Sequence, residues 1–192
     1  IAKFFLDLGA NDVVCVDKCG VLCAGEDYAN PAHVEIARLT NKRGIRGTLA
    51  DALRGADVFL GVSAPKIVSQ DMIKSMNAGA IVFPLANPVP EITRDEALAA
   101  GAAVVGTGAS NQPNQINNVL MFPGIFRGAL DVRARDINTD MQRAAAHALS
   151  SLVSDKELCA DYILPNPLDK RVVGAVAAAV ADAARKSGVA RK

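Results

Sequence analysis

Asp57-Val58-Phe59-Leu60-Gly61-Val62 is a short, nearly unbroken apolar run. Such a run is typical of a strand buried on both faces of a parallel sheet, because a half-exposed strand alternates apolar and polar residues. Similar runs occur at residues 13–16, 81–83 and 103–106. We therefore expect four buried strands, the first of them ending at Asp17.

Helices are expected before and between these strands. Residues 1–8 read as the last turns of a helix, and residues 51–54 and 70–76 as two more, the latter with Ser69 as its N-cap. Thr93 and Glu96 form a capping box, in which each side chain satisfies the other residue's backbone N–H. Strands and helices that alternate about every 20 to 25 residues predict right-handed βαβ crossovers. The predicted fold class is α/β, a doubly wound, Rossmann-like parallel sheet.

Beyond Pro123 the pattern changes to helices alone. Thr139 and Gln142 read as a second capping box. The apolar stripe expected on the helix that follows consists of Met141, Ala145, Ala148, Leu149 and Leu152. A last helix is expected over residues 171–186. We expect residues 1–124 to form the Rossmann-like domain and residues 125–192 to form a C-terminal helical segment that packs on it.

The composition excludes several classes of function. Lys and Arg number 21 and Asp and Glu 20, a net charge of +1, which argues against a nucleic-acid or anionic-membrane partner. No apolar stretch reaches the roughly 18 residues that cross a bilayer. The chain of 192 residues is large enough to need no disulfides, so its four cysteines are expected to be reduced thiols of a cytoplasmic protein. Without an initiator Met, the chain is expected to begin inside a longer protein.

Ligands of such a sheet bind at the carboxyl ends of its strands, which draws attention to Asp17 and Lys18. An acidic residue in this position hydrogen-bonds the adenosine ribose in nucleotide-binding sheets, although an Asp after a strand is as often an ordinary turn residue. The glycine-rich phosphate loop and first strand would precede Ile1, so the domain is expected to be N-terminally incomplete. Lys18 could meet the 2′-phosphate of NADP, which leaves NAD and NADP both open.

The loops after the other strands hold small and amide residues. Val62 and Ser63 follow the second strand, where small residues let a cofactor approach the backbone. Asn87 precedes Pro88, so it is held extended and its amide can offer a donor and an acceptor to a ligand. The amides of residues 114–118 could bind a carboxamide and a carboxylate. Ordinary turns and helix caps explain each loop about as well on local chemistry alone.

Four stretches in this order resemble the bacterial, short-subunit malic enzymes, and the resemblance spans essentially the whole chain. They are residues 47–53 (Gly-Thr-Leu-Ala-Asp-Ala-Leu), 55–63 (Gly-Ala-Asp-Val-Phe-Leu-Gly-Val-Ser), 85–91 (Leu-Ala-Asn-Pro-Val-Pro-Glu), and 113–118 (Pro-Asn-Gln-Ile-Asn-Asn) with 122–131 (Phe-Pro-Gly-Ile-Phe-Arg-Gly-Ala-Leu-Asp). One departure lies at residues 108–111, which read Gly-Ala-Ser-Asn where relatives usually have Gly-Arg-Ser-Asp.

The resemblance implies that malate is oxidised by hydride transfer to NAD or NADP and decarboxylated to pyruvate and CO2, assisted by a divalent metal, Mg or Mn. It implies that Asn87 lies at the nicotinamide and substrate end, that Asn117 and Asn118 contact the malate carboxylate or the carboxamide, and that the adenosine side is lined by Asp17, Lys18, Val62 and Ser63. The family's general-base Lys, acid Tyr and metal ligands precede this part. No catalytic or metal-binding residue is therefore expected within the chain, which is expected to be inactive alone.

The family usually forms dimers or larger homo-oligomers, so another copy of the chain is an expected partner beside malate and pyruvate. Two alternatives stay open from the residues themselves. One is a related dehydrogenase that acts on amino acids or folate, and the other is a non-catalytic module that senses a nicotinamide nucleotide.

Overall fold

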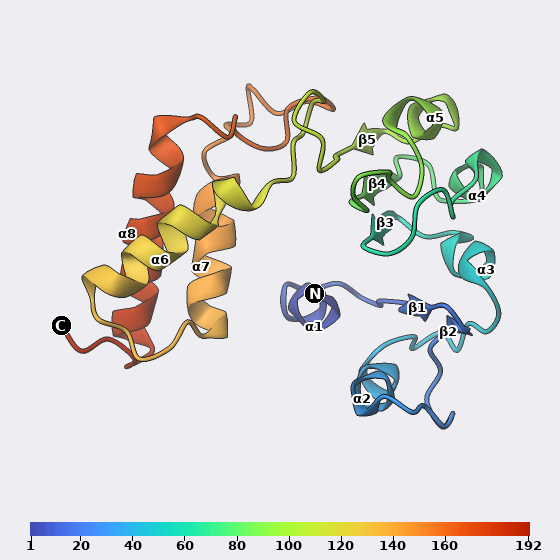
Figure 1. Cartoon of the computed structure of the whole chain (residues 1–192), viewed down its shortest axis with the longest axis horizontal. Helices are drawn as coiled ribbons and strands as arrows, with labels where there is room; N and C mark the ends of the chain where they lie inside the picture. The colour runs from blue at the N-terminus through green and yellow to red at the C-terminus, as the bar shows by residue number, and fades with distance from the viewer.

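The computed structural model describes all 192 residues and contains the predicted parallel sheet (Figure 1). Strands β3 (Val58–Gly61), β4 (Ile81–Pro84) and β5 (Val104–Val105) pair in parallel in the order β3-β4-β5. Helices α4 (Gln70–Lys74) and α5 (Arg94–Ala99) form the two crossovers between them. The predicted α/β, Rossmann-like fold class is confirmed.

The apolar core of this sheet is centred on β4, which has a strand on each side. Val82 and Val105 are 0% and 1% exposed, and Ile73 and Ala97 pack on them from α4 and α5. Together with α3 (Leu49–Leu53), these helices run along one side of the strands in Figure 1. The starts of α4 and α5 agree with the sequence prediction, whereas α3 begins at Leu49, two residues before the predicted start at residue 51. The Ser69 hydroxyl accepts a hydrogen bond from the backbone of α4, and the capping box of α5 is present.

The prediction for the first strand was wrong. Residues 13–15 pair with no other strand, and only β1 (Val16–Asp17) forms a ladder, antiparallel to β2 (Gly20–Val21). An apolar run joins a sheet only where a neighbouring strand offers free N–H and C=O groups. In this chain the carbonyl oxygens of Val13 and Cys15 instead accept backbone N–H groups of Asn41 and Leu22. The parallel sheet therefore has three strands rather than four.

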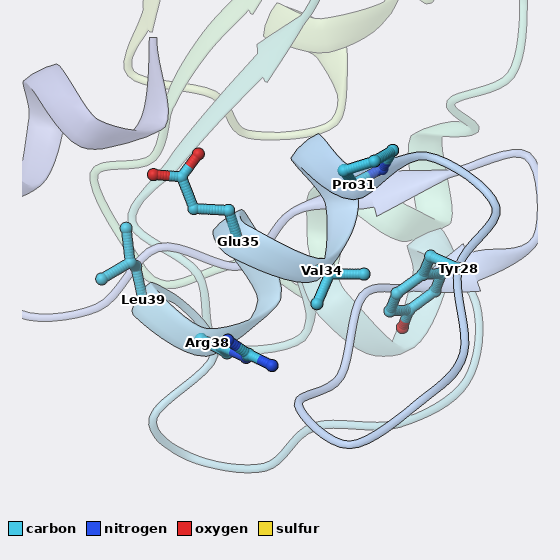
Figure 2. Close-up of a pocket in the computed structure, with 6 residues that line it drawn as sticks. All are labelled: Tyr28, Pro31, Val34, Glu35, Arg38 and Leu39. Atoms are coloured by element: carbon cyan, nitrogen blue, oxygen red, sulfur yellow. The ribbon is translucent and has the colours of Figure 1, made fainter.

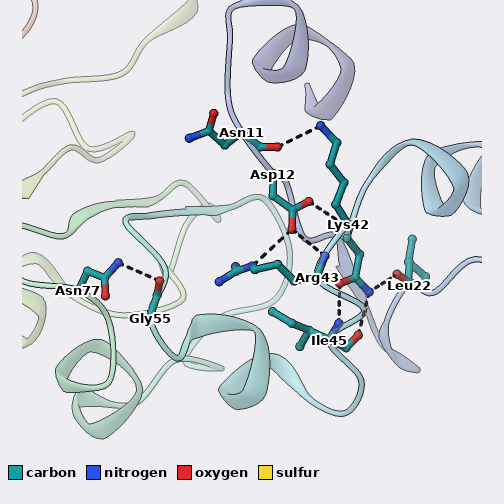
Figure 3. Close-up of polar contacts among 9 residues, drawn as sticks. Asn11, Asp12, Leu22, Lys42, Arg43, Ile45, Gly55 and Asn77 are labelled. Carbon is teal, nitrogen blue, oxygen red and sulfur yellow. Dashed lines mark hydrogen bonds and ion pairs between the residues drawn. The ribbon is translucent and has the colours of Figure 1, made fainter.

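The N-terminal segment contains β1, β2 and the helices α1 (Ala2–Asp7) and α2 (Pro31–Leu39). Hydrogen bonds between side chains and backbone groups stabilise it. Figure 3 shows the Asp12 carboxylate facing Lys42 and Arg43, and it accepts the Lys42 N–H at 2.9 Å. Burial by itself raises the pKa of Asp12, but the N–H donors of Lys42 and Arg43 outweigh it and hold that pKa below its usual value. The charged form of Asp12 therefore stabilises the fold.

The C-terminal helices form a second body with its own core, at the left in Figure 1. After a 3-10 turn, η1 (Asn118–Leu120), helices α6 (Phe122–Asp131) and α7 (Thr139–Ser150) pack against α8 (Lys170–Lys186). The first apolar cluster ends at Val105 and the second begins at Leu120. The domain boundary at residue 124 stays a prediction. No helix in the structure combines the length and hydropathy of a membrane span.

The N-terminus of α7 differs from the prediction, because Asn138 caps it in place of Thr139. The Asn138 side-chain oxygen accepts the Met141 N–H at 3.1 Å, so the helix begins at Thr139. Asn is among the strongest N-cap residues and tolerates the extended backbone that a cap requires. The predicted stripe on this helix is buried at Met141, Ala145 and Leu149, and its other two members, Ala148 and Leu152, are half-buried.

Helices α6 and α8 lie close together because α6 presents Gly124 and Gly128 to its partner. A Cβ atom at Gly128 would lie 2.4 Å from the carbonyl oxygen of Ala177 and 2.8 Å from the Cβ of Val180. A backbone carbonyl in a helix cannot move aside without breaking its own hydrogen bond. Any side chain at Gly128 would therefore push the two helices apart.

We predict that Gly128→Ala lowers the free energy of unfolding by about 1–3 kcal/mol, the usual cost of overpacking a tight contact. The matched control is Gly174→Ala in α8, where a Cβ would meet no atom within 4 Å. That change should raise stability by about 0.5–1 kcal/mol, because alanine is the better helix former. Urea unfolding followed by circular dichroism measures both, and two changes of the same sign would contradict the packing described.

We predict that the stability difference between the wild type and Asp12→Asn shrinks as the pH falls from 6 toward 3. Because the pKa of Asp12 is lowered in the folded state, its contribution is complete above the pKa of the unfolded chain and is lost as the pH drops through the folded value. Asp27→Asn, at an exposed position without an ion pair, is the control. A difference that does not vary with pH would show that the Asp12 charge contributes nothing.

Candidate functional site

The loops that follow β3, β4 and β5 meet at one edge of the sheet, because parallel strands all end on the same side. Val62 and Ser63 lie in the first loop and Asn87 in the second, and all three are exposed. The structure therefore brings together three of the residues predicted from the sequence. Direct backbone bonds join these two loops, from the Leu85 N–H to the Gly61 oxygen and from the Lys66 N–H to the Pro90 oxygen, each 3.0 Å long.

A buried carboxylate braces the same two loops. Glu91 is 0% exposed, and one of its oxygens accepts the Ser63 N–H at 2.8 Å while the other accepts the Ala86 N–H at 3.0 Å. Its side chain fills the space in front of Gly61, where a Cβ atom would lie 2.5 Å from the Glu91 Cδ. Gly61 is therefore required here by the close approach of Glu91.

Asn114 anchors the third loop. Its side-chain NH2 donates to the Val105 oxygen at 3.0 Å and to the Ala160 oxygen at 2.7 Å, and its side-chain oxygen accepts the Ile163 N–H at 2.9 Å. Asn114 is buried and has a φ of 52°, in the left-handed region that Asn tolerates better than most residues. Asn114 thus ties the end of β5 to the segment that leads into α8.

A hollow of about 230 Å³ lies between the loops after β4 and β5. Asn87 and Pro88 line one side, and Thr107 and Gly108 the other. Arg94 also borders the hollow, and its guanidinium group pairs with the Asp161 carboxylate. The lining combines small Pro, Ala and Gly residues with the polar side chains of Asn87, Arg94 and Thr107, so the hollow suits a compact group that has both apolar and polar atoms.

Asn117 and Asn118 lie at the start of η1, outside the lining of this hollow. The Asn117 side-chain oxygen accepts the Val119 N–H at 3.0 Å, so Asn117 acts as a helix cap. Both residues are exposed. Gln115 forms a parallel bridge with Thr107 in the loop after β5, but no hydrogen bond joins Asn117 or Asn118 to Asn87.

Asp17 and Lys18 lie apart from these loops, at the end of β1 and in the turn that leads to β2. Both are exposed, and the Asp17 carboxylate lies 3.7 Å from the His33 ring nitrogen Nδ1. No hydrogen bond joins either residue to the loops after β3, β4 and β5. The structure therefore does not bring them into the cluster formed by Val62, Ser63 and Asn87.

A second hollow, of about 390 Å³, lies on the outer face of α2. Figure 2 shows its lining, formed by Tyr28 and by residues of the helix from Pro31 to Leu39. None of the residues predicted to bind a ligand borders it. We therefore place the candidate site at the edge of the sheet.

The chain contains no group of three or more His, Cys, Asp or Glu side chains arranged to hold a metal ion.

Comparison with known families identifies the sheet and its loops. The sequence profile of the family described as "Malic enzyme, NAD binding domain" matches residues 7–185. The chain belongs to the malic enzyme family. Neither amino-acid nor folate dehydrogenases are supported by this match.

Similar malic enzymes extend well beyond this chain. It is 50% identical to a bifunctional malic/malolactic enzyme of Bacillus subtilis over 100% of the chain and 47% of that protein. It is 47% identical to an NADP-dependent malic enzyme of Rhizobium meliloti over 94% of the chain and 25% of that protein. The crystal structure of a malic enzyme from Pyrococcus horikoshii matches with a TM-score of 0.90 and 43% identity, over 99% of the chain and 46% of that structure. The chain thus spans about half or less of the length of these malic enzymes.

Sequence reasoning missed two residues that shape the candidate site, Glu91 and Asn114. Both stood within motifs that the sequence singled out, but neither received a role of its own. A Glu directly after Pro-Val-Pro reads as an exposed loop residue, and only its tertiary contacts reveal the buried carboxylate. The sequence suggests Asn114 and its amide neighbours as possible ligand contacts, whereas the Asn114 side chain makes three hydrogen bonds within the protein.

We predict that Asn114→Ala destabilises the chain by about 3 kcal/mol, since it removes three hydrogen bonds worth roughly 1 kcal/mol each. The control is Asn111→Ala in the same loop, where the side chain is exposed and unbonded. Chemical denaturation measures both variants. Equal stability of Asn114→Ala and Asn111→Ala would refute the anchoring role.

Proposed function

We propose that the protein to which this chain belongs converts malate to pyruvate and CO2 with hydride transfer to NAD or NADP, and that this chain supplies the dinucleotide-binding half. The observation that carries the proposal is the family match over residues 7–185, together with cross-linked loops at the carboxyl edge of a parallel sheet. That edge is where dinucleotides bind in such folds.

The chain's own groups suit the polar parts of a dinucleotide. We propose that Val62 and Ser63 line its adenosine side and that Asn87 faces the nicotinamide and the substrate. The exposed amide of Asn87, the Ser63 hydroxyl and nearby backbone carbonyls offer the donors and acceptors that a ribose and a carboxamide require. When bound, the dinucleotide accepts the hydride.

We further propose that Asp17 and Lys18 extend the adenosine side and influence the choice between NAD and NADP. A carboxylate there favours ribose hydroxyls, and a cation favours a 2′-phosphate. Both residues are exposed and free to meet a ligand, although they stand on the separate β1–β2 turn. The Rhizobium meliloti relative is an NADP-dependent enzyme by name, which supports keeping both cofactors in the proposal.

Asn117 and Asn118 are proposed to contact the malate carboxylate or the carboxamide. Asn118 is the stronger candidate, because its amide makes no hydrogen bond within the chain, while that of Asn117 already serves as a cap. The general-base Lys, the acid Tyr and the ligands of a divalent metal, Mg or Mn, are proposed to come from outside this chain.

We propose that the enzyme is a cytoplasmic homo-oligomer, dimeric or larger, with malate and pyruvate as its small-molecule partners. Its nearly neutral net charge of +1 supports small molecules and protein subunits as partners over nucleic acid.

The direct test uses the full-length protein with Mg²⁺ or Mn²⁺ and each cofactor in turn. Malate-dependent formation of pyruvate and reduced cofactor, in equal amounts, is the expected result. Cofactor binding without turnover would instead support a nucleotide-sensing module, and the proposed reaction would be rejected.

We predict that Asn87→Ala and Asn118→Ala in that protein each lower kcat/KM for malate about 100-fold, as expected for the loss of a hydrogen bond to a charged or reacting group. Asn11→Ala is the control, because its side chain is exposed and unbonded at the far end of the chain. Unchanged malate kinetics in both test variants, with the fold intact by circular dichroism, would remove these residues from the site.

A further inference from the structure

We propose that Glu91 is a positioning residue that sets the backbone of two loops to receive the dinucleotide. The inference rests on the proposed function for the ligand, but the bracing itself can be tested without any ligand. Its starting point is the unusual situation of the Glu91 carboxylate, which is fully buried and has no ion-pair partner.

Burying a charge without a cation is costly, by several kcal/mol in general. The partners found for Glu91 are backbone N–H groups, one from each loop. An apolar side chain of similar volume would fill the same space, but it would leave the Ser63 and Ala86 N–H groups without this acceptor. What an apolar side chain cannot do is fix the orientation of the Ser63 and Ala86 N–H groups.

Fixing those two N–H groups also fixes the carbonyls on the other side of the same peptide units. A trans peptide is planar, and its C=O points opposite to its N–H. With the Ser63 and Ala86 N–H groups turned toward Glu91, the carbonyls of Val62 and Leu85 point away from it. Neither carbonyl oxygen accepts a hydrogen bond from any group of the chain.

The geometry therefore assigns these two carbonyls as acceptors for a ligand, held beside Ser63 and Asn87. Acceptors without donors suit hydroxyl and amide N–H groups, which the ribose and carboxamide parts of a dinucleotide carry. Glu91 itself touches no ligand in this arrangement. It acts through the loops, and the space that it needs explains the glycine at position 61.

The test is Glu91→Gln in the full-length enzyme, which keeps the side-chain volume but turns one acceptor into a donor that faces an N–H group. We expect the Kd for NAD or NADP, measured by titration without malate, to rise about tenfold or more, in line with the loss of a hydrogen bond to a charged group. The matched control is Val82→Ala, which weakens the core of β4 and leaves both loop contacts in place. It should change the Kd less than twofold at a similar loss of stability.

Three results would overturn the proposal. One is an unchanged Kd in Glu91→Gln, and another is an equal rise in Val82→Ala, since general destabilisation would then explain the effect. The third comes from hydrogen exchange of the wild type without ligand, which covers the case in which Glu91→Gln does not fold. The Ser63 and Ala86 amides should exchange at least about tenfold more slowly than those of Val62 and Asn87, and equal rates would show that no brace exists. If the wild type shows protected amides but binds neither NAD nor NADP, the proposed function fails while the brace stands.

Discussion

The local structure of the candidate site depends on one constraint, the need of the buried Glu91 carboxylate for hydrogen-bond donors. Two backbone N–H groups meet that need, and they come from the loops after neighbouring parallel strands. Gly61 follows from the same constraint, because any larger residue would occupy the space of the carboxylate. The loops that carry Val62, Ser63 and Asn87 are therefore held by the interior of the protein, and the exposed side chains are left free for a ligand.

These contacts explain how the loops proposed to bind the dinucleotide can hold their conformation before the ligand binds. The apolar core of the parallel sheet fixes where the strands end. Glu91 holds the first two loops, and Asn114 ties the third loop to the segment that leads into α8. Loops held in this way lose little conformational freedom when a ligand binds, which favours affinity. Membership of the malic enzyme family supports NAD or NADP as the proposed ligand of these loops. The groups that decarboxylate malate are proposed to lie outside the chain.

Much of the fold could be predicted from sequence because its signals are local. Continuous apolar runs marked β3, β4 and β5, and the side chains of Ser69 and Thr93 marked where α4 and α5 begin. The failures have equally specific causes. Residues 13–15 have the apolar character of a strand but no strand to pair with. Asn138 and Thr139 are adjacent residues that can both cap a helix, so the sequence alone does not decide between them. Glu91 and Asn114 could not be found from sequence, since their roles come from contacts with residues far along the chain.

The proposed binding surface for the dinucleotide is the edge of the sheet formed by the loops after β3 and β4. A crystal structure of the full-length enzyme with bound NAD or NADP tests it most directly. We expect the Val62 carbonyl and the Asn87 side chain to lie within hydrogen-bond distance of the cofactor, with Glu91 buried behind them. A cofactor seated elsewhere, for example in the hollow on α2, would contradict the claim.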